Sequence, residues 1–152
     1  MKKFLFFLML LCAAGCDWLA EPEGSSAKAP AGESAAWDTT GAYTVEQARS
    51  HVGEKKVAVK GYVVGGNLSS SATGISFEGP FTAATNLAIA DTLTVASKAS
   101  CLSVQLPAGA VRDSVNLVDH PDMLGRRVYF LSDIVPAYYG ITGLKNVTQV
   151  LY

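Results

Sequence analysis

The sequence predicts a mainly β domain, a five-stranded OB-type barrel with a short N-terminal helix and a helix between strands 3 and 4. Two observations lead to this fold class. Residues 43–152 contain five apolar runs with strand character, and one run with helical spacing lies between the third and the fourth. The chain has 152 residues, of which 49% are hydrophobic and 16% charged, enough for one domain with its own core. The alternative is a small α+β sheet of another topology, because alternation does not show whether a barrel closes.

The first predicted element is an amphipathic helix that begins after Thr44. Thr44 and Gln47 have the spacing of a capping box, in which each side chain accepts a hydrogen bond from the other residue's backbone N–H. Apolar residues then recur at helical spacing, namely Val45, Ala48 and Val52. Gly53 follows them as a C-terminal stop.

After Gly53 the apolar period changes to two, which is typical of strands with one buried and one wetter face. Four strands follow from this alternation. Their expected inward residues are Val57, Val59, Gly61 and Val63; Leu87 and Ile89; Leu102, Val104 and Leu106; and Val128 and Phe130. Residues 144–151 are rich in β-formers and predict the fifth strand. The glycines Gly61, Gly65 and Gly66 are expected to mark a bulge or a tight bend.

Two connections in this order are long. Residues 110–124, between the third and fourth strands, are predicted to contain a helix because Val111, Val115 and Val118 fall on one helical face. Pro121 is expected to begin a separate turn. Residues 65–85, between the first two strands, are polar and rich in Ser and Gly, which indicates either a binding loop or a mobile one.

Residues 1–15 have the composition of a secretory signal peptide. Two lysines precede an apolar run at 4–11, which is too short to span a membrane. The small residues at 13–15 lie immediately before Cys16 and resemble a bacterial lipobox, in which the cysteine thiol is acylated and becomes the new N-terminus. Cys16 is therefore the predicted lipidation site and membrane anchor. An ordinary signal peptide with an incidental cysteine is the alternative.

Residues 16–42 read as the lipidated cysteine and a flexible tether, because they are rich in Ala, Gly, Ser, Pro and Glu without apolar periodicity. This tether holds five acidic residues and one lysine, whereas residues 43–152 hold nine basic and eight acidic residues. The whole chain has a net charge of -1, which excludes a strongly basic nucleic-acid binder. We expect the protein in the cell envelope, anchored at the outer membrane. The sequence does not distinguish the periplasmic side from the cell surface. Asp17 after the cysteine can instead indicate retention at the inner membrane.

Residues 43–152 resemble a family of uncharacterised OB-fold-like modules from Gram-negative anaerobes. The likeness rests on spaced short motifs at residues 59–65, 85–91, 104–107, 111–112, 116–121, 124–128, 138–140 and 143–147. The sequence departs from the family pattern at Ser132, where Gly is common, and at His120, where Asn is common. Such modules occur as standalone lipoproteins and attached to secreted nucleases. The resemblance implies a fold and a cellular context, and no activity transfers with it.

The candidate ligand face follows from strand parity. Side chains expected on the wetter strand faces are Lys56, Lys60, Tyr62, Ser103, Gln105, Arg127 and Tyr129, while Tyr138 and Tyr139 precede the last strand. On an OB-type barrel such a face can bind single-stranded nucleic acid or an oligosaccharide, because bases and sugars stack on aromatic rings and cations contact phosphates. The proposed ligand residues are Lys56, Lys60, Tyr62, Arg127, Tyr129, Tyr138 and Tyr139. The alternative is that these side chains bind no ligand, with the cations solvated and the tyrosines half-buried over the sheet.

Two other clusters bear on catalysis. Asp119, His120 and Asp122 are the densest ligand-like group, but their spacing completes no metal motif, and helix capping by the two aspartates is the structural alternative. Cys101 could act as a nucleophile beside a histidine. Its strand parity places it with Ser103 and Gln105 on the wetter face, or near a strand end, and the favoured alternative is a small half-buried residue. We therefore expect no metal, no cofactor and no enzyme activity.

The sequence thus predicts a lipid-anchored envelope module that binds a nucleic acid, an oligosaccharide or a protein. One alternative is an accessory lipoprotein that docks on a larger envelope complex through residues 65–85. A hydrolase using Asp119, His120 and Asp122 is the third hypothesis.

Overall fold

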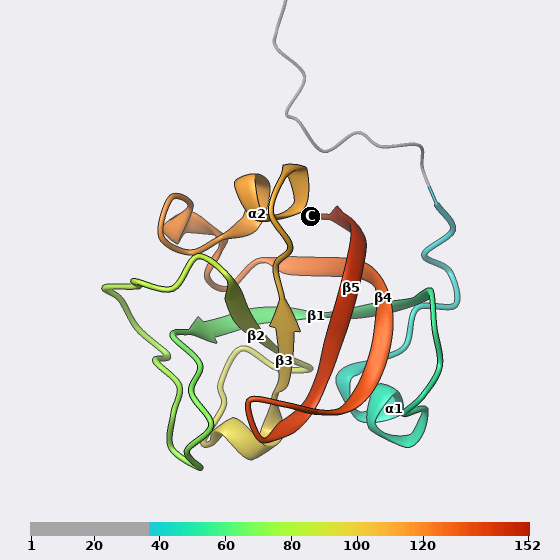
Figure 1. Cartoon of the computed structure of the whole chain (residues 1–152), viewed down its shortest axis with the longest axis horizontal. Coiled ribbons are helices and arrows are strands. Elements are labelled where there is room, and N and C mark those ends of the chain that lie inside the picture. Colours follow the sequence, from blue (N-terminus) through green and yellow to red (C-terminus); the bar gives the residue numbers. More distant parts are fainter. Residues whose placement is uncertain (1–36) are drawn as a thin grey trace, which may run out of the picture.

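The computed structural model describes residues 37–152, so the predicted signal peptide, Cys16 and most of the tether lie outside the described residues. In chain order the elements are α1 (Val45–Ser50), β1 (Val57–Gly66), β2 (Asn86–Ala90), η1 (Lys98–Ser100), β3 (Leu102–Gln105), α2 (Ala110–Val115), η2 (Pro121–Met123), β4 (Arg127–Tyr138) and β5 (Ile141–Leu151) (Figure 1). None of the helices in this described part has the length and apolar character that crossing a bilayer requires.

The five strands form a closed barrel in the order β1-β2-β3-β5-β4. β1 closes it by pairing with β4 through its first half and with β2 through its second half. The β3–β5 pair is parallel, and the other four pairs are antiparallel. The predicted fold class is therefore confirmed: a mainly β, five-stranded barrel with one short helix before it and one between strands 3 and 4.

The interior of the barrel holds the predicted inward residues. All the large apolar side chains of that set except Val57, which is half-buried, are fully buried: Val59, Val63, Leu87, Ile89, Leu102, Val104, Leu106, Val128 and Phe130. Their burial follows from the two-residue period, which points alternate side chains of each strand to the axis of the barrel. This core is the main stabilising feature of the domain.

The start of α1 is fixed by two sets of caps. Oγ1 of Thr44 accepts a hydrogen bond from the N–H of Gln47 at 3.2 Å, and Oε1 of Gln47 accepts one from the N–H of Thr44 at 2.9 Å, which confirms the capping box. The carboxylate of Asp91, which follows β2, accepts hydrogen bonds from the backbone N–H groups of Val45 and Glu46 at 2.8 and 3.0 Å. The tertiary contact with Asp91 thus satisfies helix donors that have no intrahelical partner.

The helix α1 is shorter than predicted, and the core position expected for Val52 is wrong. Val52 lies beyond the last helical turn and its side chain is 40% exposed. The chain turns away at Gly53, whose φ is +101°, and the N–H of Gly53 donates to the carbonyl of Ile134 on β4 at 2.9 Å. Glycine adopts this φ without steric cost. The chain therefore turns at the predicted Gly53, but the helix itself ends at Ser50, before it reaches Val52.

The predicted bulge in β1 is also confirmed. The register of β1 against β2 shifts between Val63 and Gly65. A Cβ atom on Gly65 would collide with the backbone carbonyl oxygen of Ser76, which belongs to the connection between β1 and β2. Glycine at this position lets that connection lie directly against the strand.

The helix predicted within residues 110–124 covers only α2, and the core position expected for Val118 is wrong, since its side chain is 41% exposed. Asn116 ends the helix: its Nδ2 donates to the carbonyl of Arg112 at 2.9 Å, and its Oδ1 accepts from the N–H of Asp119 at 2.9 Å. Pro121 begins the separate turn η2 as predicted. A polar side chain that competes for backbone groups thus stops a helix that apolar spacing would continue.

The last two strands are longer than predicted and form a hairpin. Their connection is Tyr139 and Gly140, with φ of +54° and +83°. The register of β4 against β5 shifts twice, between Leu131 and Asp133 and again between Val135 and Tyr138. These bulges interrupt the two-residue alternation, which is why the sequence pattern predicted only part of each strand.

Candidate functional site

Four of the predicted ligand residues lie together on the outside of the barrel. Lys60 and Tyr62 on β1 stand opposite Tyr129 and Arg127 on β4, as the strand register requires. We name these four residues the β1–β4 face. The guanidinium carbon of Arg127 lies 5.1 Å from the ring centroid of Tyr62, a cation–π contact that fixes both side chains. Cations and aromatic rings thus alternate across two neighbouring strands.

The cations of the β1–β4 face are available for an anion. Ion pairs within residues 37–152 join His51 to Glu54 and Arg126 to Asp122, and neither Lys60 nor Arg127 takes part in one. Arg127 is exposed, whereas Lys60 is half-buried. Stacking and charge from the same small area suit a ligand with flat rings and negative groups.

The other three predicted ligand residues lie elsewhere. Lys56 precedes β1 with a φ of +53°, and its backbone N–H donates to Oδ1 of Asp133 at 2.9 Å. Tyr138 and Tyr139 lie at the turn of the β4–β5 hairpin, with ring centroids 4.5 Å apart. Burial, followed by the neighbouring Tyr139, raises the pKa of Tyr138 to about 12. The structure therefore brings together four of the seven residues.

A second part of the barrel exterior is covered by the chain itself. Outward residues of β1 and β2 and the residue before β3 form a buried apolar cluster with one loop residue: Val64, Leu68, Ala88, Ala90 and Cys101. Ile75 and Phe77 of the β1–β2 connection pack on this cluster. We name Val64, Ala88, Ala90 and Cys101 the covered face. It is the reason that both sides of β2 are buried.

The placement of Cys101 and Ser103 on a wetter strand face was wrong. Both side chains are fully buried, because the covering segments seal the outside of the sheet there. Desolvation raises the pKa of the Cys101 thiol to about 11, so the thiolate that a nucleophile requires is disfavoured. Its Sγ donates to the carbonyl of Ser97 at 3.7 Å, and within residues 37–152 no hydrogen bond joins it to a histidine.

The long connection between β1 and β2 is tied to the barrel by two asparagines. Oδ1 of Asn67 accepts hydrogen bonds from the N–H groups of Thr82 and Ala83 at 2.8 and 3.0 Å. Oδ1 of Asn86 accepts one from the N–H of Leu68 at 2.9 Å. These bonds give the connection a fixed path over the covered face.

Lys98 in η1 is a residue that sequence reasoning missed. Its side chain is 3% exposed, and Nζ donates to the carbonyl oxygens of Ser69, Ser71 and Tyr139 at 2.5, 2.9 and 2.6 Å. One ammonium therefore joins the β1–β2 connection, η1 and the β4–β5 hairpin. No sequence pattern predicts the burial of Lys98, because a lysine between Ser and Ala residues is expected to be solvated.

Two hollows are lined in part by the connection between β2 and β3. One, of about 510 Å³, is mostly apolar and is lined by Val64, Phe77, Leu93, Val95 and Leu124, with Glu78 and Thr94 as its polar side chains. The other, of about 370 Å³, contains Glu46, Arg49 and Asp91 beside α1. Both use Thr94 and Val95. We name the first hollow the apolar groove. The sequence missed it because its walls come from four separate segments.

The cluster of Asp119, His120 and Asp122 is dispersed onto other partners. Oδ2 of Asp119 accepts from Nδ2 of Asn116 at 3.0 Å, and Oδ2 of Asp122 pairs with Arg126 at 3.1 Å. Nε2 of His120 lies 2.7 Å from the carbonyl oxygen of Asp113. Capping by the aspartates was also wrong, since η2 has no side-chain cap. Nowhere in the described chain do three or more Asp, Glu, His or Cys residues gather as metal ligands would.

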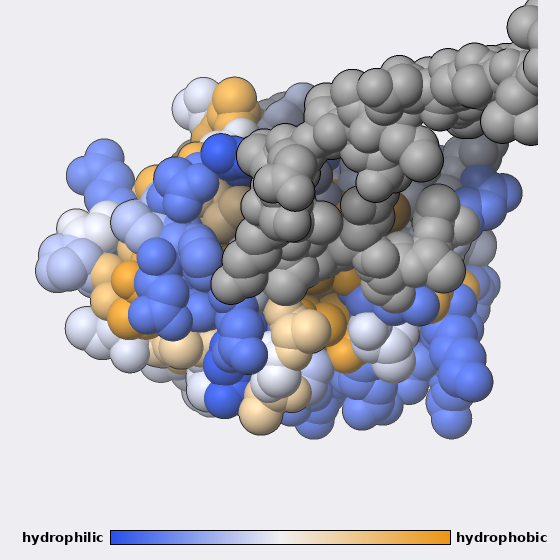
Figure 2. All heavy atoms as spheres, turned by 90° about the horizontal axis from the view of Figure 1, so that it is seen from above, coloured by the Kyte–Doolittle hydropathy of each residue, from blue (hydrophilic) through white to orange (hydrophobic). Residues whose placement is uncertain are grey.

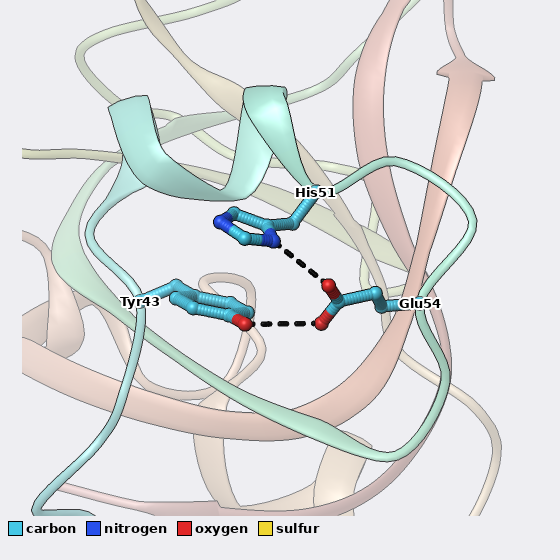
Figure 3. A network of polar contacts seen from close by, with 3 residues as sticks. All are labelled: Tyr43, His51 and Glu54. Carbon is cyan, nitrogen blue, oxygen red and sulfur yellow. Dashed lines mark hydrogen bonds and ion pairs between the residues drawn. The ribbon is translucent and has the colours of Figure 1, made fainter.

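A polar network joins the segment before α1 to the turn after it (Figure 3). The rings of Tyr43 and His51 stack with centroids 4.3 Å apart, and both residues contact the Glu54 carboxylate. Nδ1 of His51 lies 2.7 Å from Oε1 of Glu54, and the Tyr43 hydroxyl donates to Oε2 at 3.1 Å. The contact with His51, and then that with Tyr43, lowers the pKa of Glu54. The arrangement holds the start of the domain against the barrel.

One face of the domain, seen from above, is mixed in character (Figure 2). Seen from above, hydrophilic residues cover most of the visible domain and hydrophobic residues lie between them in small areas (Figure 2). Such scattered apolar exposure is normal for a globular domain.

A family model described as a domain of unknown function (DUF6359) matches residues 43–152. Neither a curated protein nor a solved structure matches the chain at a significant level. The match agrees with the expected resemblance to an uncharacterised family. The lipoprotein character and the link to nucleases stay predictions.

Proposed function

We propose that this chain, which belongs to the DUF6359 family, is a lipid-anchored module of the cell envelope that binds single-stranded nucleic acid on the β1–β4 face. The observation that carries the proposal is the array of two tyrosines and two cations on adjacent strands, with Arg127 set over the ring of Tyr62. Bases stack on aromatic rings whatever their sequence, and cations beside them contact the phosphates. The module itself performs no chemistry on the strand.

The charges favour a nucleic acid over a neutral oligosaccharide. Within residues 37–152, Lys60 and Arg127 have no carboxylate partner, so their positive charge is available to a polyanion. The face is small, and residues 43–152 carry only one more basic than acidic residue. We therefore expect micromolar affinity that falls as salt rises. An oligosaccharide that stacks on Tyr62 and Tyr129 is the competing ligand.

The anchoring part of the proposal rests on Cys16. Acylation of Cys16 would place residues 17–42 as a tether between the membrane and the domain, and more than one acyl chain gives stable attachment. Fractionation of cells producing the wild type and Cys16→Ser tests it. The wild type should be found in the outer-membrane fraction and the variant in the soluble fraction. Equal distribution of both proteins would contradict it.

The binding test uses the chain from residue 16 with Cys16→Ser, which lacks the lipid acceptor. Labelled single-stranded DNA is titrated by fluorescence anisotropy at low and moderate salt. Replacing Lys60 and Tyr62 together by Ala should weaken binding at least about tenfold, because a stacked base and a phosphate contact are both lost. The matched control replaces Lys55 and Tyr152, which are exposed and lie outside the β1–β4 face.

The melting temperature of each variant shows whether the barrel is intact. Absence of binding by the parent protein at low salt, where electrostatic attraction is strongest, would refute the nucleic-acid proposal. Binding of a labelled oligosaccharide that depends on Tyr62 and Tyr129 would then identify the competing ligand.

The accessory-lipoprotein hypothesis would use residues 65–85 as a docking loop. Ile75 and Phe77 of this segment pack on the covered face, so the large apolar side chains that a partner would contact are partly engaged within the domain. This makes the β1–β4 face the stronger candidate. A partner from envelope extract whose capture depends on residues 65–85 would favour the docking hypothesis.

A further inference from the structure

The apolar groove lies directly beside the β1–β4 face. Tyr62 packs against the covered cluster together with Phe77 and Val95, and both of those residues line the groove. Gly125 at the other wall donates its N–H to the carbonyl of Val63, the residue after Tyr62, at 2.7 Å. A strand held by Lys60 and Arg127 would therefore pass the mouth of the groove.

We propose that the groove is a subsite for one base of the bound strand and that Glu78 gives it a preference for guanine. This inference rests on the proposed function and specifies how the same ligand is recognised. A volume of about 510 Å³ lies within the range of small-ligand pockets, and its apolar walls suit the faces of an aromatic ring. Arg127, which contacts the ring of Tyr62 on the β1–β4 face, is the cation for the adjoining phosphate.

Leu93 supports a role in contact rather than in packing. It is the most exposed of the large hydrophobic residues in the described chain, at 61%, and it forms part of the groove wall. Val95, two residues further along, is half-buried. A leucine held open beside Phe77 provides an apolar surface that a flat ring could cover.

Glu78 provides the polar discrimination. Glu78 is an exposed residue that lines the groove, and its carboxylate accepts no hydrogen bond from another residue between 37 and 152. A carboxylate only accepts hydrogen bonds and can receive two at once. Guanine presents two adjacent donors on its pairing edge, the N1–H and the N2 amino group. Adenine and cytosine present a single amino group there, and thymine presents one N–H between two carbonyl oxygens, which a carboxylate repels. The expected order is guanine first and thymine last.

The experiment compares nonamers of thymidine in which the central nucleotide is dG, dA, dC or dT. Anisotropy is measured with the same Cys16→Ser chain from residue 16. The dG nonamer should bind at least about fivefold more tightly than the all-dT nonamer, which is the lower end of the discrimination that one bidentate base contact provides. Inosine in place of guanine keeps N1–H but lacks the N2 amino group, and should lose most of this difference.

Two variants separate the base contact from the charge contact. Glu78→Gln should bring the dG to dT affinity ratio close to one, because an amide donates as well as accepts. Leu93→Ala should weaken all four nonamers by a similar factor, about threefold or more, since stacking does not distinguish bases. The controls are Glu46→Gln in the other hollow and Val118→Ala, an exposed valine that does not line the groove. Both controls should bind as the parent does.

The outcomes distinguish this inference from the proposed function. If the nonamers bind with equal affinity, or if Glu78→Gln keeps the dG preference, the subsite is refuted while binding to the β1–β4 face stands. If no nonamer binds, or if replacing Lys60 and Tyr62 changes nothing, the proposed function fails and the subsite fails with it.

Discussion

The outside of β1 is divided into two regions with opposite character. Lys60 and Tyr62, in the half that pairs with β4, lie on the open β1–β4 face, whereas Val64, in the bulge, lies under the β1–β2 connection. Both regions belong to one strand and both contain outward side chains. The comparison teaches that burial on a barrel exterior depends on what the connecting segments cover, in addition to the parity of the strand.

The covered face is suited to its cover by its small residues. Ala88 and Ala90 are outward residues of β2 with almost no exposure. Their short side chains leave space for Ile75 and Phe77 of the connection to approach the sheet. On the β1–β4 face the outward residues are long and amphipathic, so they shield the sheet with their own stems. A change that reverses either character should therefore have unequal effects on the two regions.

The largest effect is expected from a charge placed on the covered face, under the β1–β2 connection. Ala88→Asp would bury an unpaired carboxylate, and we expect a loss of about 3–5 kcal/mol in the free energy of unfolding. The matched control is Ala58→Asp, an outward alanine on β1 beside the open face, which is half-buried. Urea unfolding of both variants measures the difference. Similar losses in the two variants would show that the covered face is no more sealed than the open one.

A smaller effect is expected from removing the Lys98 ammonium, which binds the β1–β2 connection over the covered face. Lys98→Met keeps the side-chain stem but leaves the carbonyls of Ser69, Ser71 and Tyr139 without their donor, at a cost of about 1–3 kcal/mol. With Cys16 replaced, Cys101 is the single thiol from residue 16 onward. It lies beneath the cover, so its labelling by a thiol reagent at pH 8 should accelerate in this variant. Lys55→Met, at an exposed lysine, should leave both quantities unchanged. A stable variant with unchanged labelling would show that Lys98 does not fix the β1–β2 connection over Cys101.

Two buried serines should respond in opposite directions. Oγ of Ser103 donates to the carbonyl of Tyr138 at 2.6 Å, whereas Oγ of Ser132 has no partner in the structure. Ser103→Ala should therefore lower the free energy of unfolding by about 1 kcal/mol, and Ser132→Ala should raise it by a similar amount. Thermal and urea unfolding of the two variants provide the measurement. Destabilisation by Ser132→Ala would reveal a partner for that hydroxyl.

The smallest effect concerns acid. Because the pKa of Glu54 is lowered by His51 and Tyr43, its carboxylate stabilises the fold above the unfolded pKa, 4.5. This contribution is lost as the pH falls through the lower folded pKa. Glu54→Gln should therefore flatten the decrease in melting temperature below about pH 4.5. Glu46→Gln on the exposed side of α1 serves as the charge control. An acid profile of Glu54→Gln identical to that of the wild type would exclude this network as the cause.

Strand alternation and helix capping identified most of the architecture. The inward residues of four strands, the capping box at Thr44 and the separate turn at Pro121 were predicted because each depends on neighbours in sequence. Val52 and Val118 were misplaced because apolar spacing alone does not show where a helix ends. Cys101 was misplaced because strand parity does not show that a connecting segment packs over the outer side of the sheet. The four residues of the β1–β4 face were predicted from strand parity. Lys98 and the apolar groove were not predicted.

The sequence by itself determined the order of the elements, the residues that face the barrel axis and the polar parity of Lys60, Tyr62, Arg127 and Tyr129. These properties follow from side-chain period and local hydrogen bonding, which act over a few residues. Only the tertiary structure decided that Tyr62 pairs with Arg127, that Ala88 is sealed, and that three segments meet at Lys98. Those contacts join residues far apart in the chain, and they depend on barrel closure and on the path of one long connection, neither of which local patterns specify.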